Sequence, residues 1–127
     1  MQSNTLFGSP ALPLYNDSKI VEQPADIYHL GDKYVDAFER LAGLAMKTQN
    51  PFFAYIPFSH MHTPLAFDEK FKNSSEHGIY GDTLRELDSM VGRIVDTVDR
   101  YGQTKNTLLV FTGDNGNWEV KCKYGGK

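Results

Sequence analysis

Two stretches of the chain alternate apolar and polar residues with the period of an α-helix. Across residues 32–48 the apolar side chains recur at spacings of three and four, which places them on one helical face. These positions are Val35, Phe38, Leu41, Ala42 and Ala45. Asp32 suits the N-cap position, and Asn50-Pro51 stops the pattern. We therefore predict a surface helix over residues 32–48, packed on a sheet.

A second, longer helix is predicted from Asp82 or Thr83 to Tyr101, with Gly102 as the residue that ends it. Its apolar stripe consists of Leu84, Leu87, Val91, Ile94, Val98 and Tyr101. Thr83 and Glu86 have the spacing of a capping box. A stripe of this length also occurs in coiled coils, but this helix lies between two predicted strands. A crossover helix packed on a sheet is therefore the favoured interpretation.

Two short apolar runs, residues 52–56 and 108–112, predict buried strands. Both are rich in aromatic or β-branched residues and are too short for helices. Strand, helix and strand from Phe52 to Thr112 then form one βαβ unit of an α/β fold, with a right-handed crossover. Parallel strands place their carboxyl ends at one edge of the sheet, and ligands of such sheets bind there.

Ionisable and polar residues follow both predicted strands. Asp114 and Asn115, flanked by glycines, offer hard oxygen ligands suited to Ca²⁺ or Mg²⁺. Ordinary turn chemistry is the alternative interpretation of this sequence. His60 and His62 follow the first strand and point the same way if the backbone is extended, which Pro64 favours. They could bind an oxyanion, transfer a proton or hold a metal, or be surface or packing histidines.

The chain before the first helix has little periodicity. Prolines at positions 10, 13 and 24 interrupt any strand ladder, so residues 1–31 are predicted to be an extended loop segment. Residues 32–127 form the α/β portion, and residues 1–127 together make one partial domain. Two N-glycosylation sequons begin at Asn16 and Asn73 in polar segments, which favours a secreted or lysosomal protein.

Composition and charge exclude several classes of protein. The formal charge of −3 and the lack of a basic block give no electrostatic footprint for nucleic acid. No apolar stretch is long enough to span a membrane, and the first residues lack a signal-peptide pattern. A hydrophobic fraction of 40% is sufficient for a packed core. Cys122 is the single cysteine, so an internal disulfide is excluded.

Four motifs, taken in order and spacing, carry a family resemblance over roughly residues 10–122. They are Pro51-Phe-Phe-Ala-Tyr, His-x-His-x-Pro at 60–64, Gly81-Asp82-x-Leu84-x-Glu86-Leu87-Asp88-x-x-Val91-Gly92, and Phe111-Thr112-x-Asp114-Asn115-Gly116. With these motifs the chain resembles the sulfatases, and specifically the arylsulfatases. The resemblance implies an alkaline-phosphatase-like α/β sheet flanked by helices, and hydrolysis of aryl or sugar sulfate esters.

The resemblance also implies roles for individual residues. Asp114 and Asn115 would be ligands of one active-site Ca²⁺. His62 would contact the sulfate of the substrate and help to protonate the leaving group. Asp114 would also lie close enough to the nucleophile to help activate it. A lysosomal or secreted location is implied as well.

Other parts of the family's active site have no match in this chain. The family nucleophile is a formylglycine made from cysteine in a Cys/Ser-x-Pro-x-Arg motif, and Cys122 precedes Lys123-Tyr124-Gly125 instead. The family's Asp-Asp pair and its sulfate-binding lysine segment are absent too. We therefore expect a central fragment, with the remainder of the catalytic domain outside it. Alone, it should bind metal weakly and show no sulfatase turnover.

Two other hypotheses remain open. A phosphodiesterase or phosphomutase of the same superfamily would use an unmodified Ser or Thr with two transition metals. An Asp-His pair near residue 114 would favour that chemistry, whereas Asp114-Asn115 favours a single hard cation. The third hypothesis is a truncated, non-catalytic product.

Overall fold

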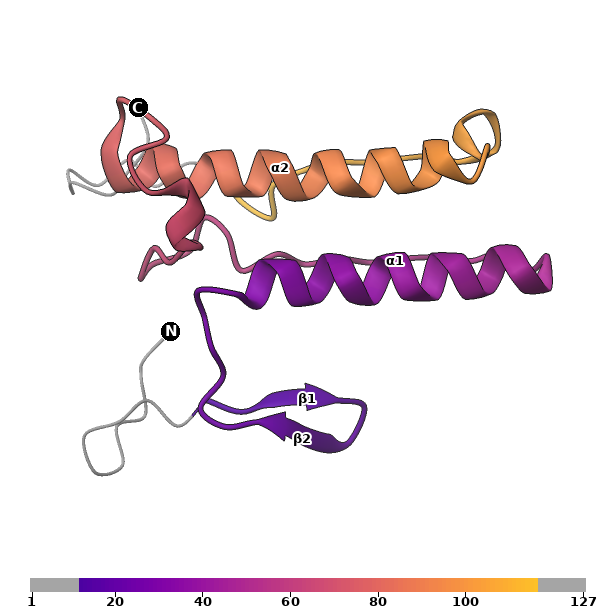
Figure 1. Cartoon of the computed structure of the whole chain (residues 1–127), viewed down its shortest axis with the longest axis horizontal. Coiled ribbons are helices and arrows are strands. Elements are labelled where there is room, and N and C mark those ends of the chain that lie inside the picture. The colour runs from indigo at the N-terminus through magenta and orange to yellow at the C-terminus, as the bar shows by residue number, and fades with distance from the viewer. Residues whose placement is uncertain (1–11, 117–127) are drawn as a thin grey trace.

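The computed structural model describes residues 12–116, which contain two long α-helices and a small β-hairpin (Figure 1). The elements are β1 (Leu14–Asn16), β2 (Lys19–Glu22), α1 (Leu30–Thr48), η1 (Glu69–Phe71), α2 (Gly78–Arg100) and η2 (Thr104–Asn106), where η marks a short 3₁₀ helix. The helices α1 and α2 lie side by side and run in the same direction. This mixed α/β content confirms the predicted fold class. Within the described part of the chain, no helix combines the length and apolar character that a membrane span needs.

The hydrophobic core lies between the two helices. Its buried side chains are Val35, Phe38, Ala42, Leu87, Met90, Ile94 and Val98. The helical periodicity therefore identified most of the core. Three members of the predicted stripes, Leu41, Leu84 and Tyr101, are instead substantially exposed. Because α1 and α2 pack chiefly against each other, only part of each stripe has a partner.

Both helices begin earlier than predicted. The N-cap of α1 is His29, so Asp32 lies in the first turn rather than at the cap. The N-cap of α2 is His77, and neither cap residue makes a side-chain capping hydrogen bond. The end of α2 was predicted correctly, since Gly102 adopts a left-handed φ of 66° just after it.

The predicted capping box at Thr83 and Glu86 is wrong. The Thr83 hydroxyl donates to the carbonyl of Ile79 one turn earlier, at 2.7 Å, so Thr83 is already inside the helix. The neighbouring Asp82 is buried and accepts hydrogen bonds from the backbone N–H groups of Asn73 and Ser75, both at 2.9 Å. Asp82 therefore holds the loop before α2 rather than the end of the helix.

Residues 12–24 form a hairpin where an extended loop was expected. The strands β1 and β2 pair antiparallel, with Asn16 opposite Lys19. Asp17 in the turn takes a left-handed φ of 53°, a conformation that aspartate tolerates better than most residues. Pro13 precedes β1 and Pro24 follows β2, so neither proline interrupts the ladder.

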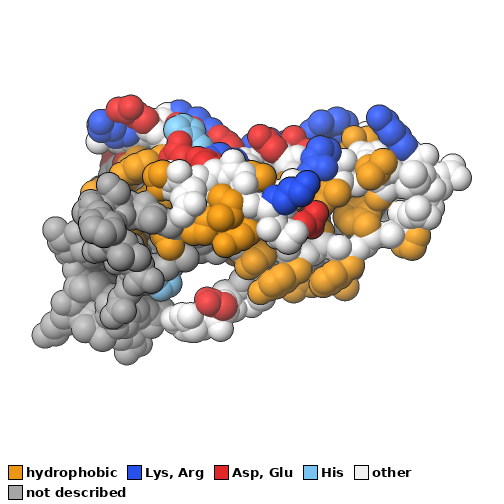
Figure 2. All heavy atoms as spheres, turned by 90° about the horizontal axis from the view of Figure 1, so that it is seen from below, with side chains coloured by type: hydrophobic (Ala, Val, Ile, Leu, Met, Phe, Trp, Pro, Cys, Tyr) orange, Lys and Arg blue, Asp and Glu red, His pale blue; other side chains and the backbone are white. Residues whose placement is uncertain are grey.

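The two predicted strands, residues 52–56 and 108–112, form no ladder. Each segment runs back along its helix in the same sense (Figure 1), but the sheet within residues 12–116 contains β1 and β2 alone. The strand pairing of the predicted βαβ unit is therefore not formed. Phe53 and Leu108 have exposed fractions of 91% and 89%, and Figure 2 shows broad hydrophobic areas at the molecular surface. Apolar strands of this kind are normally buried on both faces by neighbouring elements.

Candidate functional site

The loop after residues 52–56 presents His62 to solvent. The backbone N–H of His62 donates to the carbonyl of Ser59 at 3.0 Å, which closes a turn. The His62 ring is exposed, and its Nδ1 lies 2.6 Å from the carbonyl oxygen of Thr63. Because a carbonyl can only accept, Nδ1 carries the proton in this contact. The outer nitrogen, Nε2, makes no hydrogen bond within residues 12–116.

His60 points into the protein instead of lying beside His62. Its side chain is 4% exposed, and its Nε2 lies 2.8 Å from Oε2 of Glu86, which is also 4% exposed. Residues 60–64 form a turn and a bend, so the predicted extended backbone is wrong. The two histidines therefore occupy different environments. The sequence spacing could not reveal this, because Glu86 lies 26 residues further along the chain.

Asp114 and Asn115 lie in an exposed bend after residues 108–112. Neither side chain makes a hydrogen bond within residues 12–116, and the local contact is from the Thr112 hydroxyl to the Gly113 carbonyl, at 3.1 Å. The carboxylate and amide oxygens are thus accessible. Their chemistry fits a hard cation, but Ca²⁺ takes six to eight oxygen ligands, so they supply a partial set. No group of three or more His, Cys, Asp or Glu that could hold a metal occurs in the described residues.

The structure does not join the two predicted site loops. Between the loop of His60 and His62 and the turn of Asp114 and Asn115, residues 12–116 contain no hydrogen bond or ion pair. The extended segments that precede these loops run in the same sense along their helices (Figure 1). A shared crevice therefore stays a prediction.

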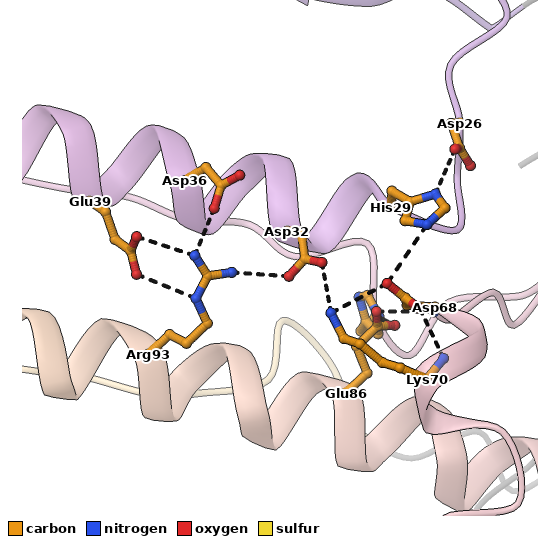
Figure 3. Close-up of polar contacts among 10 residues, drawn as sticks. Asp26, His29, Asp32, Asp36, Glu39, Asp68, Lys70, Glu86 and Arg93 are labelled. Atoms are coloured by element: carbon orange, nitrogen blue, oxygen red, sulfur yellow. Dashed lines mark hydrogen bonds and ion pairs between the residues drawn. The ribbon is translucent and has the colours of Figure 1, made fainter.

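A network of charged side chains, which the sequence analysis missed, connects α1 to α2 and to η1 (Figure 3). The guanidinium of Arg93 contacts three carboxylates of α1, at 3.0 Å from Asp32, 2.7 Å from Asp36 and 3.2 Å from Glu39. The hydrogen bond to Asp36 is the largest cause that raises the pKa of Arg93 above its usual value. These residues are spaced for one face of α1, but the position of Arg93 opposite them is a tertiary feature.

Lys70 and His29 continue this network toward the start of α1 (Figure 3). The Lys70 ammonium lies 2.8 Å from Asp32 and 3.3 Å from Asp68, and chiefly its bond to Asp32 raises its pKa. His29 Nδ1 lies 2.6 Å from Asp26, which raises the pKa of the imidazole and lowers that of the carboxyl. All these contacts are partly exposed, and they hold elements together rather than forming a reaction centre.

Both sequon asparagines lie at the surface. Asn16 ends β1, and Asn73 precedes α2; both are exposed. Cys122 lies outside the described residues.

Comparisons with known proteins agree with one another. Residues 5–119 match the model of the family described as Sulfatase. The chain is 41% identical over 116 residues to arylsulfatase G of Mus musculus and 40% identical to that of Homo sapiens, covering 91% of this chain and 22% of each relative. It is 31% identical over 119 residues to arylsulfatase A of Homo sapiens, covering 94% of this chain and 24% of the relative. The chain thus spans less than a quarter of the length of these relatives.

Proposed function

The chain belongs to the sulfatase family, and we propose that it supplies part of the active site of a calcium-dependent sulfuric ester hydrolase. The observation that carries this proposal is the family match over residues 5–119, which includes both predicted site loops. The identity with arylsulfatases G and A supports aryl or sugar sulfate esters as substrates. The nucleophile and further ligands would come from the remainder of the catalytic domain.

His62 is proposed to bind the sulfate and to donate a proton to the leaving-group oxygen. Its exposure and the anchoring of Nδ1 on the Thr63 carbonyl support this role, because they leave Nε2 accessible from solvent. Cleavage of a sulfate ester builds negative charge on oxygen atoms. A protonated imidazole can offset that charge and can act as a general acid near neutral pH.

Asp114 and Asn115 are proposed as two ligands of the Ca²⁺. Their accessible oxygens and the hard-oxygen preference of the ion support the assignment. When bound, the ion would supply positive charge opposite the sulfate oxygens. The Asp114 carboxylate is also proposed to accept the proton of the nucleophile.

A lysosomal or secreted location is proposed together with this function. The exposure of Asn16 and Asn73 supports their use as glycosylation sites. Treatment of the cell-derived protein with an N-glycosidase should increase its electrophoretic mobility. The variants Asn16→Gln and Asn73→Gln should each remove one step of that shift.

The catalytic role is tested by activity of the full-length protein on a chromogenic aryl sulfate. We expect His62→Ala to lower kcat/KM by ~10²–10⁴-fold, the usual contribution of a general acid. We expect Asp114→Ala to lower kcat/KM and to raise the Ca²⁺ concentration needed for half-maximal activity. His77→Ala is the matched control, because this histidine is exposed and makes no side-chain capping bond. Equal activity of the His62 and His77 variants would contradict the proposed role.

Substrate choice separates the proposal from its alternatives. Preferential hydrolysis of an aryl phosphate diester would favour the phosphodiesterase hypothesis. A full-length protein without turnover of either ester would favour the non-catalytic one. The 127-residue chain alone is expected to show no turnover. Because it offers only a partial ligand set, calorimetry should detect at most weak Ca²⁺ binding.

A further inference from the structure

We propose that His60 and Glu86 are positioning residues for His62: their buried pair fixes the loop that presents His62 to the substrate. This inference rests on the proposed function for the role of His62 in catalysis. The geometry of the pair is independent of that function.

The pair connects the loop to α2 at a fully enclosed point. His60 Nε2 lies 2.8 Å from Glu86 Oε2, and each side chain is 4% exposed. The other oxygen, Oε1, accepts the backbone N–H of Asp68 at 3.1 Å. Both oxygens of Glu86 are therefore used, so the carboxylate has one orientation. It ties two separate loop segments to the same helix.

His60 also lies against α1. Its Cε1 atom lies 3.5 Å from the place that a β-carbon on Gly31 would occupy. The ring is thus held between the first turn of α1 and the middle of α2. Met61, the next residue, packs against the hydrophobic core. The chain therefore has two consecutive anchors immediately before His62.

The turn transmits this anchoring to His62. The N–H of His62 donates to the Ser59 carbonyl at 3.0 Å, and the turn that this bond closes contains His60 and Met61. His62 is consequently exposed at the end of a short, fixed segment. His60 itself is too deeply buried to touch a substrate, which makes it a positioning residue rather than a catalytic one.

The partners of His60 fix its tautomer. A carboxylate only accepts hydrogen bonds, so the proton facing Glu86 must be on Nε2 of His60. Nδ1 of His60 is buried and has no hydrogen-bond partner within the described residues. A proton there would leave a donor without an acceptor, which is unfavourable. His60 is therefore assigned as the Nε2–H tautomer.

The first test is the tautomer of His60 in the ¹⁵N-labelled chain, measured by imidazole NMR. A glutamine side chain accepts only through its single oxygen, so in Glu86→Gln it cannot accept from both the Asp68 N–H and the Nε2–H of His60 at the positions of the two carboxylate oxygens. We expect shifted ring signals of His60 and shifted backbone amide signals of His62. Asp26→Asn is the matched control, because it alters the exposed pair with His29 and should leave His60 unchanged. An Nδ1–H tautomer before substitution would overturn the assignment, and unchanged His60 and His62 signals in Glu86→Gln would overturn the proposed link between Glu86 and the loop of His62.

The second test is a double-mutant cycle in the full-length protein with an aryl sulfate. Substitutions of residues that orient a metal-ligating histidine commonly cost ~10–100-fold in activity, and by analogy we expect a loss of this size in kcat/KM for Glu86→Gln. If Glu86 acts through His62, Glu86→Gln should change kcat/KM less than about twofold in a His62→Ala background. The reason is that the effects of residues that act as a unit do not add. A purely structural role would give equal losses in both backgrounds and would overturn the proposal.

The two tests distinguish the failure of this inference from the failure of the proposed function. If His62→Ala has no effect, the catalytic role of His62 is wrong, and positioning for catalysis falls with it. If His62→Ala is inactive while Glu86→Gln is fully active, the proposed function stands and positioning is wrong.

The donor of His60 can be tested by two further variants. His60→Phe, which keeps a ring but removes the donor, should reproduce the loss of kcat/KM seen in Glu86→Gln. His60→Gln, which restores a donor, should recover part of it.

Discussion

Gly31 in the first turn of α1 lies directly against Met90 of α2. A β-carbon on Gly31 would be 2.3 Å from the sulfur of Met90, a residue that is 2% exposed, so the thioether would have to repack within the core. Gly31→Ala should therefore lower the free energy of unfolding by ~1–3 kcal/mol, as overpacking does. Urea unfolding measures this change.

Gly92 provides the matched comparison on α2. A β-carbon there would meet no atom within 4 Å. Gly92→Ala should raise the free energy of unfolding by ~0.5–1 kcal/mol, because alanine has the higher helix propensity. Destabilisation of similar size in both variants would show that close packing at Gly31 is not the cause.

Ile94 tests the core between the helices. Its side chain is 8% exposed, and Ile94→Ala should cost ~2–5 kcal/mol through lost burial and a cavity. Ile79 on the same helix is 52% exposed, so Ile79→Ala should change stability far less. Thermal unfolding followed by circular dichroism compares the two variants, and equal losses would contradict the described packing.

Arg93 tests the link between α1 and α2. Arg93→Gln removes three ion pairs and leaves Asp32, Asp36 and Glu39 close together. Because the side chains of these four residues are partly exposed to solvent, we expect Arg93→Gln to lower the free energy of unfolding by only ~1 kcal/mol. This loss should shrink as salt is added. Arg85→Gln, an exposed arginine on the same helix without an ion pair in residues 12–116, is the control. A salt-independent loss would exclude an electrostatic origin.

The pair of His29 and Asp26 predicts a pH window. The bond to Asp26 raises the pKa of His29 in the folded protein above its usual value of 6.5. The pair's contribution to folding stability through His29 is therefore complete below pH 6.5 and is lost as pH rises through the higher folded pKa. The bond to His29 lowers the pKa of Asp26 in the folded protein below its usual value of 3.8. The stability contributed through Asp26 is therefore present above pH 3.8 and is lost as pH falls through the lower folded pKa. NMR titration should find the His29 pKa lowered in Asp26→Asn and unchanged in Asp36→Asn.

The exposed apolar segments predict self-association of the isolated chain. Phe53 and Leu108 lie on segments whose backbones have no ladder partner within residues 12–116, and exposed apolar edges favour pairing with other chains. Phe53→Lys should lower the apparent mass in concentration-dependent size-exclusion chromatography. Ile79→Lys, also exposed but on a helix, should have less effect. Association equal in both variants would exclude the extended segment as the contact.

Periodicity in the sequence identified both helices and most of their shared core, because burial against one partner imposes a repeat that can be read locally. Val35 and Ile94 are examples. The start of α2 was missed because Asp82 and Thr83 have the composition of caps, whereas the loop of residues 73–75 folds back onto Asp82. That contact is decided by tertiary structure.

For the candidate site, the sequence indicated which residue types follow each apolar run and at which positions they lie. His62 is exposed, which both the substrate-binding and the surface-histidine interpretations allow, whereas the burial of His60 did not follow from its spacing. Its partner Glu86 had a plausible local use as a capping residue, and that alternative concealed the long-range pair. Pairing of the two apolar runs requires neighbouring strands, so periodicity alone could not establish it.

The parallel arrangement of α1 and α2 gives the helix pair a net dipole along its axis. Since both helices run the same way, their backbone dipoles add, and the positive ends lie together at one end of the pair (Figure 1). Asp32 in the first turn of α1 meets that positive end, whereas Lys47 and Arg100 lie in the last turns of the two helices. Each such charge typically adds ~0.3–1 kcal/mol to helix stability. Charge reversal at Asp32 or Lys47 would therefore remove this contribution from α1, and charge reversal at Arg100 would remove it from α2.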